Sequence, residues 1–104
     1  MDIALQEARA AGERGEVPVG AVVTDARTGE VLARAGNRVE ELSDPTAHAE
    51  ILVIRDAAAR LGTPRLTECD LTVTLEPCAM CAQAVVLARL RRLTFGAYDP
   101  KGGG

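Results

Sequence analysis

The chain contains no tryptophan, one phenylalanine and one tyrosine among its 104 residues, so large aromatic side chains cannot dominate its core. Its hydrophobic content is nevertheless 47%, which excludes an intrinsically disordered protein. We therefore expect a core of alanine, valine, leucine and isoleucine. A chain of this length buries more than about 60% of its unfolded surface, enough for one modest core, so residues 1–104 are predicted to form a single domain.

Long apolar runs and an even set of cysteines are also absent, which bears on cellular location. No segment approaches the ~20 apolar residues that a membrane span requires, and Met1 opens into a polar, charged segment unlike a signal peptide. The three cysteines are an odd number, which argues against a disulfide framework. We therefore predict a cytoplasmic protein that does not bind membranes.

A strong positive charge is the last feature that the chain lacks. The formal net charge is −3, so no global basic field indicates a nucleic-acid partner. Any nucleic acid must be held by a local group of cations, and the candidates are Arg89, Arg91, Arg92 and Lys101. The alternative is a solvated helix end, where cations interact favourably with the helix dipole.

The chain does contain one strong chemical signal, which pairs His48-Ala49-Glu50 with Pro77-Cys78-Ala79-Met80-Cys81. One imidazole and two thiolates suit Zn²⁺ and leave the fourth tetrahedral position open for water. Zinc lowers the pKa of such a water to about 7, and a nearby glutamate can accept its proton and deliver it to a leaving nitrogen. H-x-E followed by P-C-x-x-C is the signature of zinc nucleobase deaminases. We therefore predict His48, Cys78 and Cys81 as zinc ligands and Glu50 as the catalytic residue.

The spacing of the two cysteines has its own rationale. Cys78 and Cys81 are three residues apart, so on a helical turn they point the same way and can hold one ion. Pro77 suits the first position of that helix, whose N-terminus favours the thiolate form of a first-turn cysteine. Periodicity does not place His48 and Glu50 together, because residues two apart lie on different sides of a helix. Their joint role rests on the signature.

Each half of the signature also has a simpler interpretation. A lone C-x-x-C can be a redox pair or half of a structural zinc site, and a single histidine is often only a core or surface residue. The combination of the two halves favours the deaminase site. Cys69 has no partner at metal-binding spacing and is interpreted as an ordinary small residue before a strand.

Periodicity and turn residues predict alternating helices and strands. In chain order they are a helix over 2–14, strands over 18–24 and 30–35 that form a hairpin, a helix ending at 62, a strand around 71–75, a helix from 77 to about 89 or 90, and a strand over 93–97. This order implies an α/β sandwich whose later strands run parallel. Both halves of the zinc signature lie at helix N-termini after strands, where open α/β sheets place their sites.

Two of the predicted helices have identifiable caps and apolar faces. Asp2 can cap the first helix, whose face is Ala4, Ala8 and Ala11. Residues 36–45 form a loop, after which Asp44 or Thr46 can cap the second helix and place His48 in its first turn. The predicted apolar face of this second helix consists of Ala47, Ile51, Ile54, Ala58 and Leu61.

Five segments carry a closer resemblance, namely Glu16-Val17-Pro18-Val19-Gly20-Ala21-Val22, Gly36-Asn37-Arg38, Asp44-Pro45-Thr46-Ala47-His48-Ala49-Glu50-Ile51, Thr74-Leu75-Glu76-Pro77-Cys78-Ala79-Met80-Cys81 and Phe95-Gly96-Ala97-Tyr98-Asp99-Pro100-Lys101. They resemble the successive motifs of the bacterial tRNA-specific adenosine deaminases, within the cytidine and deoxycytidylate deaminase-like zinc superfamily. The resemblance implies a three-layer α/β/α fold with a mixed sheet, a bound zinc ion and a homodimer. It also implies conversion of adenosine to inosine at the wobble position of a tRNA anticodon loop, or in another single-stranded nucleic acid.

The same resemblance implies roles for single residues. His48, Cys78 and Cys81 would bind zinc, and Glu50 would shuttle protons. Asn37 would hydrogen-bond the flipped base, the alternative being a turn residue with left-handed geometry. Asp99 would lie beside the nucleic acid, the alternative being a loop aspartate that bonds its own backbone. Tyr98 stands where an arginine is common and offers a ring for stacking.

The chain departs from this family at its C-terminal end. Members usually continue with a fifth strand and one or two C-terminal helices, whereas this chain ends in Gly102-Gly103-Gly104. We therefore expect a shortened deaminase domain in which the strand over 93–97 has an unpaired edge. A second copy of the chain could cover that edge in a two-fold dimer.

Three functions remain open on the sequence. The first is zinc-dependent hydrolytic deamination of adenosine in RNA. The second is deamination of a free base or nucleoside such as guanine or cytosine, because guanine deaminases share both halves of the signature. The third is a zinc-stabilised scaffold with little activity. Glu50 argues against a scaffold, because a structural zinc site needs no proton carrier and usually closes with a fourth protein ligand.

Overall fold

The centre of the fold is a mixed four-stranded sheet, found in a computed structural model that describes residues 1–96. The strand order is β2-β1-β3-β4, where β1 is Gly20–Asp25, β2 is Val31–Gly36, β3 is Cys69–Val73 and β4 is Arg92–Phe95. β1 pairs antiparallel with both β2 and β3, and β3 pairs parallel with β4. The predicted hairpin and the predicted parallel pair are therefore confirmed. Ala97, predicted to end the last strand, lies outside the described residues.

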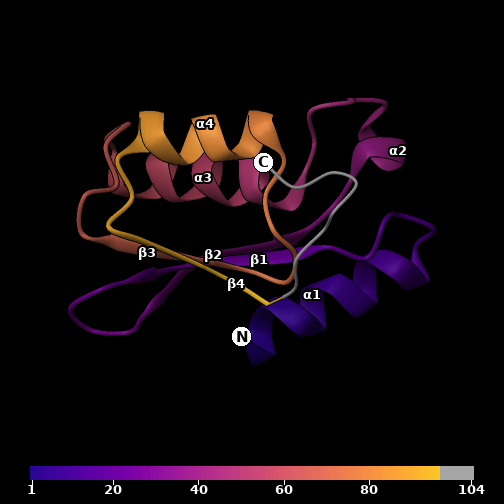
Figure 1. Cartoon of the computed structure of the whole chain (residues 1–104), viewed down its shortest axis with the longest axis horizontal. Coiled ribbons are helices and arrows are strands. Elements are labelled where there is room, and N and C mark those ends of the chain that lie inside the picture. Colours follow the sequence, from indigo (N-terminus) through magenta and orange to yellow (C-terminus); the bar gives the residue numbers. More distant parts are fainter. Residues whose placement is uncertain (97–104) are drawn as a thin grey trace.

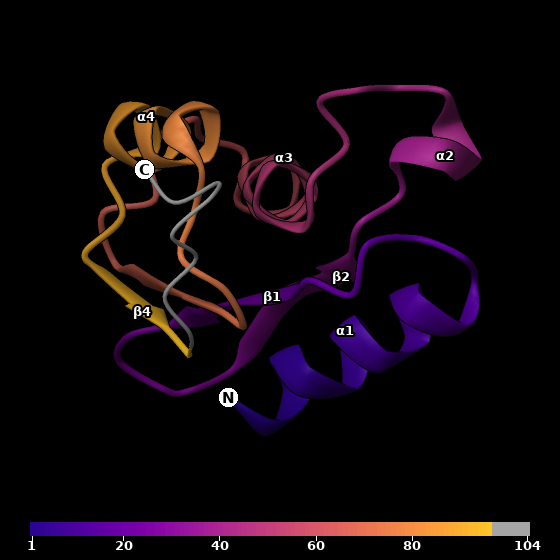
Figure 2. The ribbon, with the colours of Figure 1, turned by 45° about the vertical axis from the view of Figure 1, so that its right-hand side comes forward.

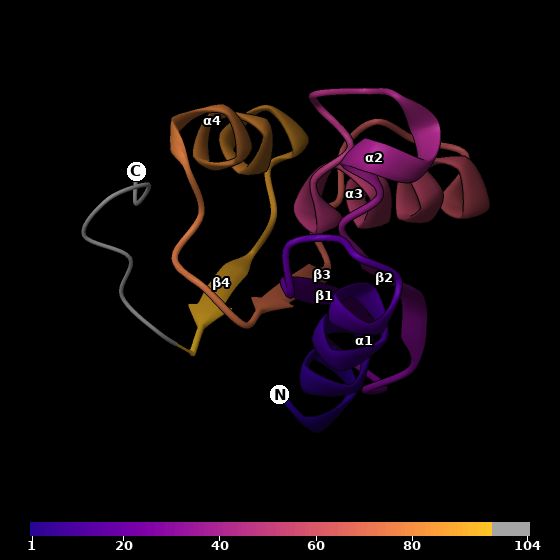
Figure 3. The ribbon, with the colours of Figure 1, turned by 90° about the vertical axis from the view of Figure 1, so that its right-hand side faces the viewer.

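Helices cover both faces of this sheet in three layers. The helix α1, Asp2–Glu13, lies on one face, and α3, Ala49–Leu61, and α4, Ala79–Ala88, lie on the other (Figures 1 and 3). This arrangement confirms the predicted α/β/α fold. Across residues 1–96, no helix combines the length and the apolar composition needed to cross a bilayer.

The core contains the small and branched aliphatic side chains that the composition predicts. The buried members of its main cluster are Val19, Ala21, Val23, Leu32, Ala33, Ala35, Ala49, Val53, Ala57, Leu66, Cys69, Leu71, Val73 and Ala88. Cys69 is buried, but it is the first residue of β3 and does not precede the strand as predicted. Such a core depends on close approach between layers more than on large side chains.

Close approach is most evident where α1 packs on the hairpin. Ala4, Ala8 and Ala11 are buried on the predicted face. A Cβ atom added to Gly20 would clash with the backbone of Ala4 and Ala8, so glycine is required there. The predicted cap is wrong, however: Met1 is the N-cap, and its carbonyl accepts the first helical hydrogen bond from Leu5 N.

The helix α3 differs from its prediction in its start and its buried face. It begins at Ala49 with His48 as N-cap, whereas the Asp44 carboxylate accepts hydrogen bonds from the Thr46 backbone and hydroxyl instead of capping the helix. The sheet-facing residues are Ala49, Val53 and Ala57. The predicted face was wrong because α3 is covered on two sides, and its half-buried residues Ile51, Ile54 and Ala58 border a hollow that α4 residues also line.

Two further helix boundaries were not predicted. A short helix α2, Val39–Leu42, interrupts the predicted loop after β2, on the same side of the sheet as α3 (Figure 2). The helix α4 begins at Ala79 with Cys78 as N-cap, so Pro77 precedes the helix and does not occupy its first position. These shifts matter because α2 and both N-caps border the cavity described next.

Candidate active site

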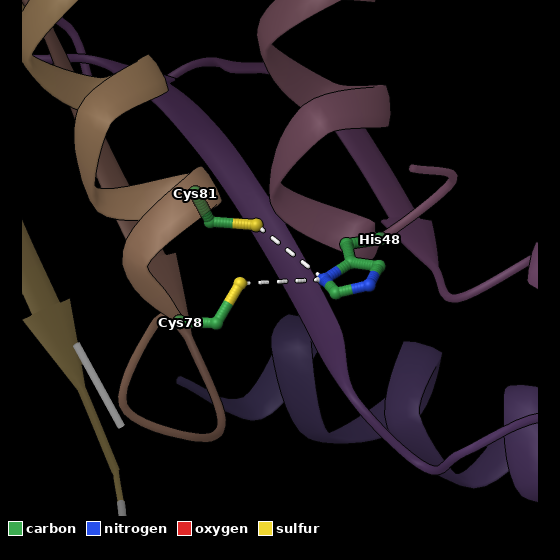
Figure 4. Close-up of side chains that lie close together, drawn as sticks. All are labelled: His48, Cys78 and Cys81. Atoms are coloured by element: carbon green, nitrogen blue, oxygen red, sulfur yellow. Dashed lines mark hydrogen bonds between the residues drawn. The ribbon is translucent and has the colours of Figure 1, made fainter. Parts of the chain in front are cut away.

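His48, Cys78 and Cys81, three residues from two helix N-termini, come together as the signature predicts. His48 is the N-cap of α3, Cys78 is the N-cap of α4, and Cys81 follows in the first turn of α4. His48 Nδ1 lies 3.7 Å from Cys78 Sγ and 3.6 Å from Cys81 Sγ (Figure 4). The three potential ligand atoms all lie within 4.8 Å of one another, which is close enough to hold one metal ion.

The geometry and chemistry of this group fit zinc. A tetrahedral ion with bonds of about 2.05 Å to nitrogen and 2.3 Å to sulfur holds those atoms about 3.6 Å apart, which is close to both measured separations. One imidazole and two thiols form a donor set that zinc prefers over magnesium or calcium. Within residues 1–96 no fourth acidic, cysteine or histidine side chain joins the group. Three protein ligands with an open position are typical of catalytic rather than structural zinc.

Glu50 is a candidate functional residue beside the metal group on evidence that does not depend on the metal ligands. It lies in the first turn of α3, is only 4% exposed, and has a buried Oε1 without a hydrogen-bond partner among the described residues. Burial raises the pKa of the Glu50 carboxyl, against lowering effects from its own backbone N–H, the His48 charge and a contact with Cys81. A buried carboxyl oxygen with no protein partner is costly unless another group uses it.

The backbone conformation of His48 explains how His48 and Glu50, which are two positions apart, both reach this site. As an N-cap, His48 has extended backbone angles, φ −74° and ψ 150°, whereas Glu50 is helical. Residues two apart within a helix point to different sides, but this rule does not apply here, because His48 precedes the helical residues. Both side chains line the same cavity.

The pKa of the Cys81 thiol is shifted in the direction opposite to the one that its position in the helix predicts. Burial raises the pKa of its thiol well above the ordinary value, with further contributions from the nearby Glu50 and Cys78. A helix N-terminus alone would lower it. Burial therefore outweighs the helix, and the thiol requires a cation against it to ionise, which makes metal affinity depend on pH.

Asn37 lies at the cavity wall and its side-chain oxygen is already bonded. Oδ1 accepts a hydrogen bond of 2.8 Å from Ala49 N, the first residue of α3. Asn37 does not have the left-handed geometry of the alternative interpretation, because the non-glycine residues with positive φ among the described residues are Ser43 and Arg89. Since Oδ1 is used, the amide nitrogen, which has no hydrogen bond within residues 1–96, is the atom left for a ligand.

The cavity over this site has a volume of about 590 Å³ and a partly acidic lining. It is lined by Gly15, Glu16, Val17, Val19, Asn37, Val39, Glu40, Pro45, His48, Glu50, Leu75, Glu76 and Cys78. Among residues 1–96 no arginine or lysine contributes to this lining. The described part of the lining therefore offers apolar contacts and hydrogen-bonding groups to an uncharged ring.

The candidate arginines for nucleic-acid binding lie away from this cavity. Arg89 is the C-cap of α4, and a helix of ten residues, about 15 Å long, separates it from Cys78 at the other end. Arg92 opposes Asp70 at the start of the parallel pair, whereas the site follows the other end of β3. Arg91 is bonded to both carboxylate oxygens of Asp70, at 3.0 and 2.8 Å. Their placement favours the alternative of a solvated helix end.

Three residues of the predicted site lie beyond residue 96, and one buried cavity residue was not predicted. Tyr98, Asp99 and Lys101 lie outside the described residues. Glu16 was not predicted to have a role, although this residue is 6% exposed and lines the cavity. The available signal was a carboxylate at the head of the apolar segment Val17-Pro18-Val19, where a buried charge needs a specific partner.

Comparison with known proteins agrees with this geometry. Residues 1–97 match the family described as the cytidine and deoxycytidylate deaminase zinc-binding region. The chain is 62% identical over 103 residues to the tRNA-specific adenosine deaminase of Agrobacterium fabrum, a match that covers 99% of this chain and 66% of that protein. The chain spans about two thirds of the length of the curated relatives it matches.

Two solved structures are also similar to the fold. One, from a study of A-to-I editing by tRNA:A34 deaminases at the wobble position of transfer RNA, has a TM-score of 0.95 and 62% identity, covering 99% of this chain and 73% of that one. The guanine deaminase of Bacillus subtilis has a TM-score of 0.88 and 36% identity, covering 93% of this chain and 61% of that one.

Proposed function

The chain belongs to the family of zinc-binding cytidine and deoxycytidylate deaminases, and on that premise we propose that it converts adenosine to inosine in RNA by hydrolysis. The substrate we propose is the wobble adenosine of a tRNA anticodon loop. The relative from Agrobacterium fabrum is a tRNA-specific adenosine deaminase, and its high identity over this whole chain supports that choice. The observation that carries the proposal is the three-ligand metal group beside the buried, unpartnered oxygen of Glu50.

In the proposed mechanism, His48, Cys78 and Cys81 hold zinc, and Glu50 handles protons. Zinc, when bound, supplies a positive charge that lowers the pKa of a coordinated water to about 7. Glu50 accepts a proton from the attacking water and delivers protons to the base and to the leaving nitrogen. Water and adenosine thus become inosine and ammonia, so the atoms and charges balance. The raised pKa of Glu50 suits a group that must both accept and donate a proton near neutral pH.

Asn37 is the residue we propose for recognition of the base. Asn37 lines the cavity and its Oδ1 is bonded to Ala49 N, so its Nδ2 amide is the hydrogen-bond donor that remains for a base. A donor selects an acceptor atom on the base, such as a ring nitrogen of a purine. We also retain Asp99 as a proposed contact to the nucleic acid, outside the residues that the structure describes.

Three further properties of the protein are its domain organisation, its cellular location and its oligomeric state. We propose that residues 1–104 act as one domain, in the cytoplasm, as a homodimer. Among the described residues, β4 pairs with β3 on one side only, which leaves an edge that another chain can cover. The described cysteines, Cys69, Cys78 and Cys81, are free thiols, which suits a reducing compartment. Light scattering at micromolar concentration should show twice the mass of the single chain, and a clean monomer would contradict the dimer.

A second candidate is deamination of a free base, because the similar structure from Bacillus subtilis is a guanine deaminase. The absence of an arginine or lysine from the described cavity lining is compatible with a free base as well as with a base flipped out of RNA. Zinc-loaded protein should be incubated with an anticodon stem-loop RNA and, separately, with adenosine, cytidine and guanine. We expect inosine in the RNA, and little product from the small molecules. Xanthine from guanine, with unchanged RNA, would favour the second candidate.

A further inference from the structure

The connection between α1 and β1 reaches across to the segment that forms one wall of the cavity. Both oxygens of the Glu16 carboxylate accept backbone hydrogen bonds from α2, Oε1 from Glu40 N at 3.1 Å and Oε2 from Glu41 N at 2.9 Å. Arg14 Nη2 donates a hydrogen bond of 3.1 Å to the carbonyl oxygen of Asn37. We call these contacts of Arg14 and Glu16 the α2 clamp.

The helix α2 depends on this clamp because it cannot cap itself. It has four residues, far fewer than an isolated helix needs in water. Its N-cap, Arg38, makes no side-chain capping bond, so the first-turn amides would otherwise lack partners. Although burial opposes it, hydrogen bonds from Glu41 N and Glu40 N, with the charges of Arg14 and Arg38, lower the pKa of the Glu16 carboxyl. Glu16 is therefore a charged acceptor at neutral pH.

The segment held by the clamp contributes to the cavity but not to the metal group. Val39 and Glu40 of α2 line the cavity, as does Asn37 just before the helix. The metal group instead comes from the N-termini of α3 and α4. A change in the clamp should therefore affect the wall against which a base would lie and leave the metal group in place.

We infer that Glu16 is a positioning residue for substrate binding, which holds α2 so that the Val39 and Glu40 wall and the Asn37 amide keep their distance from the metal group. This inference rests on the proposed deaminase function. Both oxygens of Glu16 are already bonded to backbone amides, so it acts through α2 and need not touch the substrate. Misplacement of a binding wall by about 1 Å can change catalytic efficiency by up to about 100-fold.

Amide hydrogen exchange tests the clamp without any substrate. In the zinc-loaded full chain, Glu16→Ala should accelerate exchange in peptides covering 39–42 on the order of tenfold, with unchanged zinc content and unchanged exchange in α3 and α4. Glu16→Gln, which keeps one acceptor oxygen, should show a smaller acceleration. Glu13→Ala is the matched control, since Glu13 is exposed, carries the same charge and makes no hydrogen bond or ion pair within residues 1–96.

Kinetics then tests positioning of the substrate. With the substrate that the wild-type enzyme deaminates, Glu16→Ala should raise KM about tenfold and change kcat less than about threefold. Partial recovery of KM in Glu16→Gln would support the inference. A KM change without faster exchange in 39–42 would overturn it, because Glu16 would then contact the substrate directly. Equal losses of kcat and zinc would also overturn it, since they indicate damage to the metal site.

The two experiments separate failure of the inference from failure of the proposed function. If RNA is not deaminated and guanine is, the proposed substrate is wrong, and the KM test proceeds with guanine. If the wild-type protein has no activity on any substrate, the proposed function is wrong, and the exchange result alone decides the clamp. Unchanged exchange in Glu16→Ala would overturn the inference in every case.

Discussion

The Oδ1 atom of Asn37 accepts a hydrogen bond of 2.8 Å from the backbone N–H of Ala49, the residue between His48 and Glu50. One side chain of the cavity lining thus binds the first amide of α3. Because Oδ1 is used in this bond, the amide nitrogen is the atom that Asn37 has left for the base recognition we propose.

Two substitutions of Asn37 should separate these roles. Asn37→Ala loses the acceptor for Ala49 N, so the free energy of unfolding should fall by about 1 kcal/mol and KM should rise. Asn37→Asp keeps an acceptor and loses the donor, so it should lose less stability while KM still rises. Denaturant unfolding and steady-state kinetics measure both quantities. Unchanged KM in both variants would remove Asn37 from base recognition.

Substitution of Glu50 should separate chemistry from metal binding. Glu50→Ala should keep zinc and the fold and lose deamination by several orders of magnitude, because it removes the proton carrier and no ligand. Cys78→Ala should lose the metal. Zinc content by atomic emission and product formation are the measurements. Equal zinc loss in the two variants would mean that Glu50 is a ligand.

Removal of zinc should unfold much of the chain. The metal would join the N-termini of α3 and α4, and structural zinc contributes about 10 to 16 kcal/mol in small peptides, comparable with a whole domain's stability of about 5 to 15. Chelation should therefore reduce the far-UV circular dichroism signal and the melting temperature. Survival of both after complete zinc removal would show that the metal serves catalysis alone.

Acid should remove the stabilisation supplied by Glu16. The folded-state pKa of Glu16 is lowered, so its contribution is present above the ordinary pKa of 4.5 and is lost as the pH falls through the lower folded value. The groups that face it are Glu40, Glu41, Arg14 and Arg38. Wild type should melt above Glu16→Gln at pH 7, and the difference should shrink as the pH falls below 4.5 and vanish only below the lowered folded-state pKa. A constant difference across that range would contradict this linkage.

A change at Arg89 tests whether this arginine binds nucleic acid or only ends a solvated helix. Arg89 ends α4 in the left-handed region, at φ 56°, which glycine adopts without strain. Arg89→Gly should therefore stabilise the fold by about 1 kcal/mol. Affinity for the anticodon stem-loop RNA, titrated at two salt concentrations, should not change, because Arg89 lies at the far end of α4 from the cavity. A marked loss of affinity would instead identify Arg89 as a contact to the RNA phosphates.

The local parts of this protein could be read from its sequence. The hairpin, the helix faces of α1 and the metal group depend on residues that are neighbours along the chain or within one signature, such as Cys78 and Cys81. Hydrogen bonds within a turn and side chains three or four apart act over short sequence separations, so propensity and spacing report them.

Tertiary structure alone decided how those parts border the cavity. The start of α3 is set by Asn37, 12 residues before the amide it bonds, and α2 is held by Glu16 across 24 and 25 residues. The sequence predicted Asp44 or Thr46 as the cap and missed α2, because a cap from a distant segment leaves no local pattern. The observed buried face of α3 differs from the predicted face for a related reason. A helix covered by both a sheet and another helix has a wide apolar stripe, and only the packed fold shows which side of the stripe faces each neighbour.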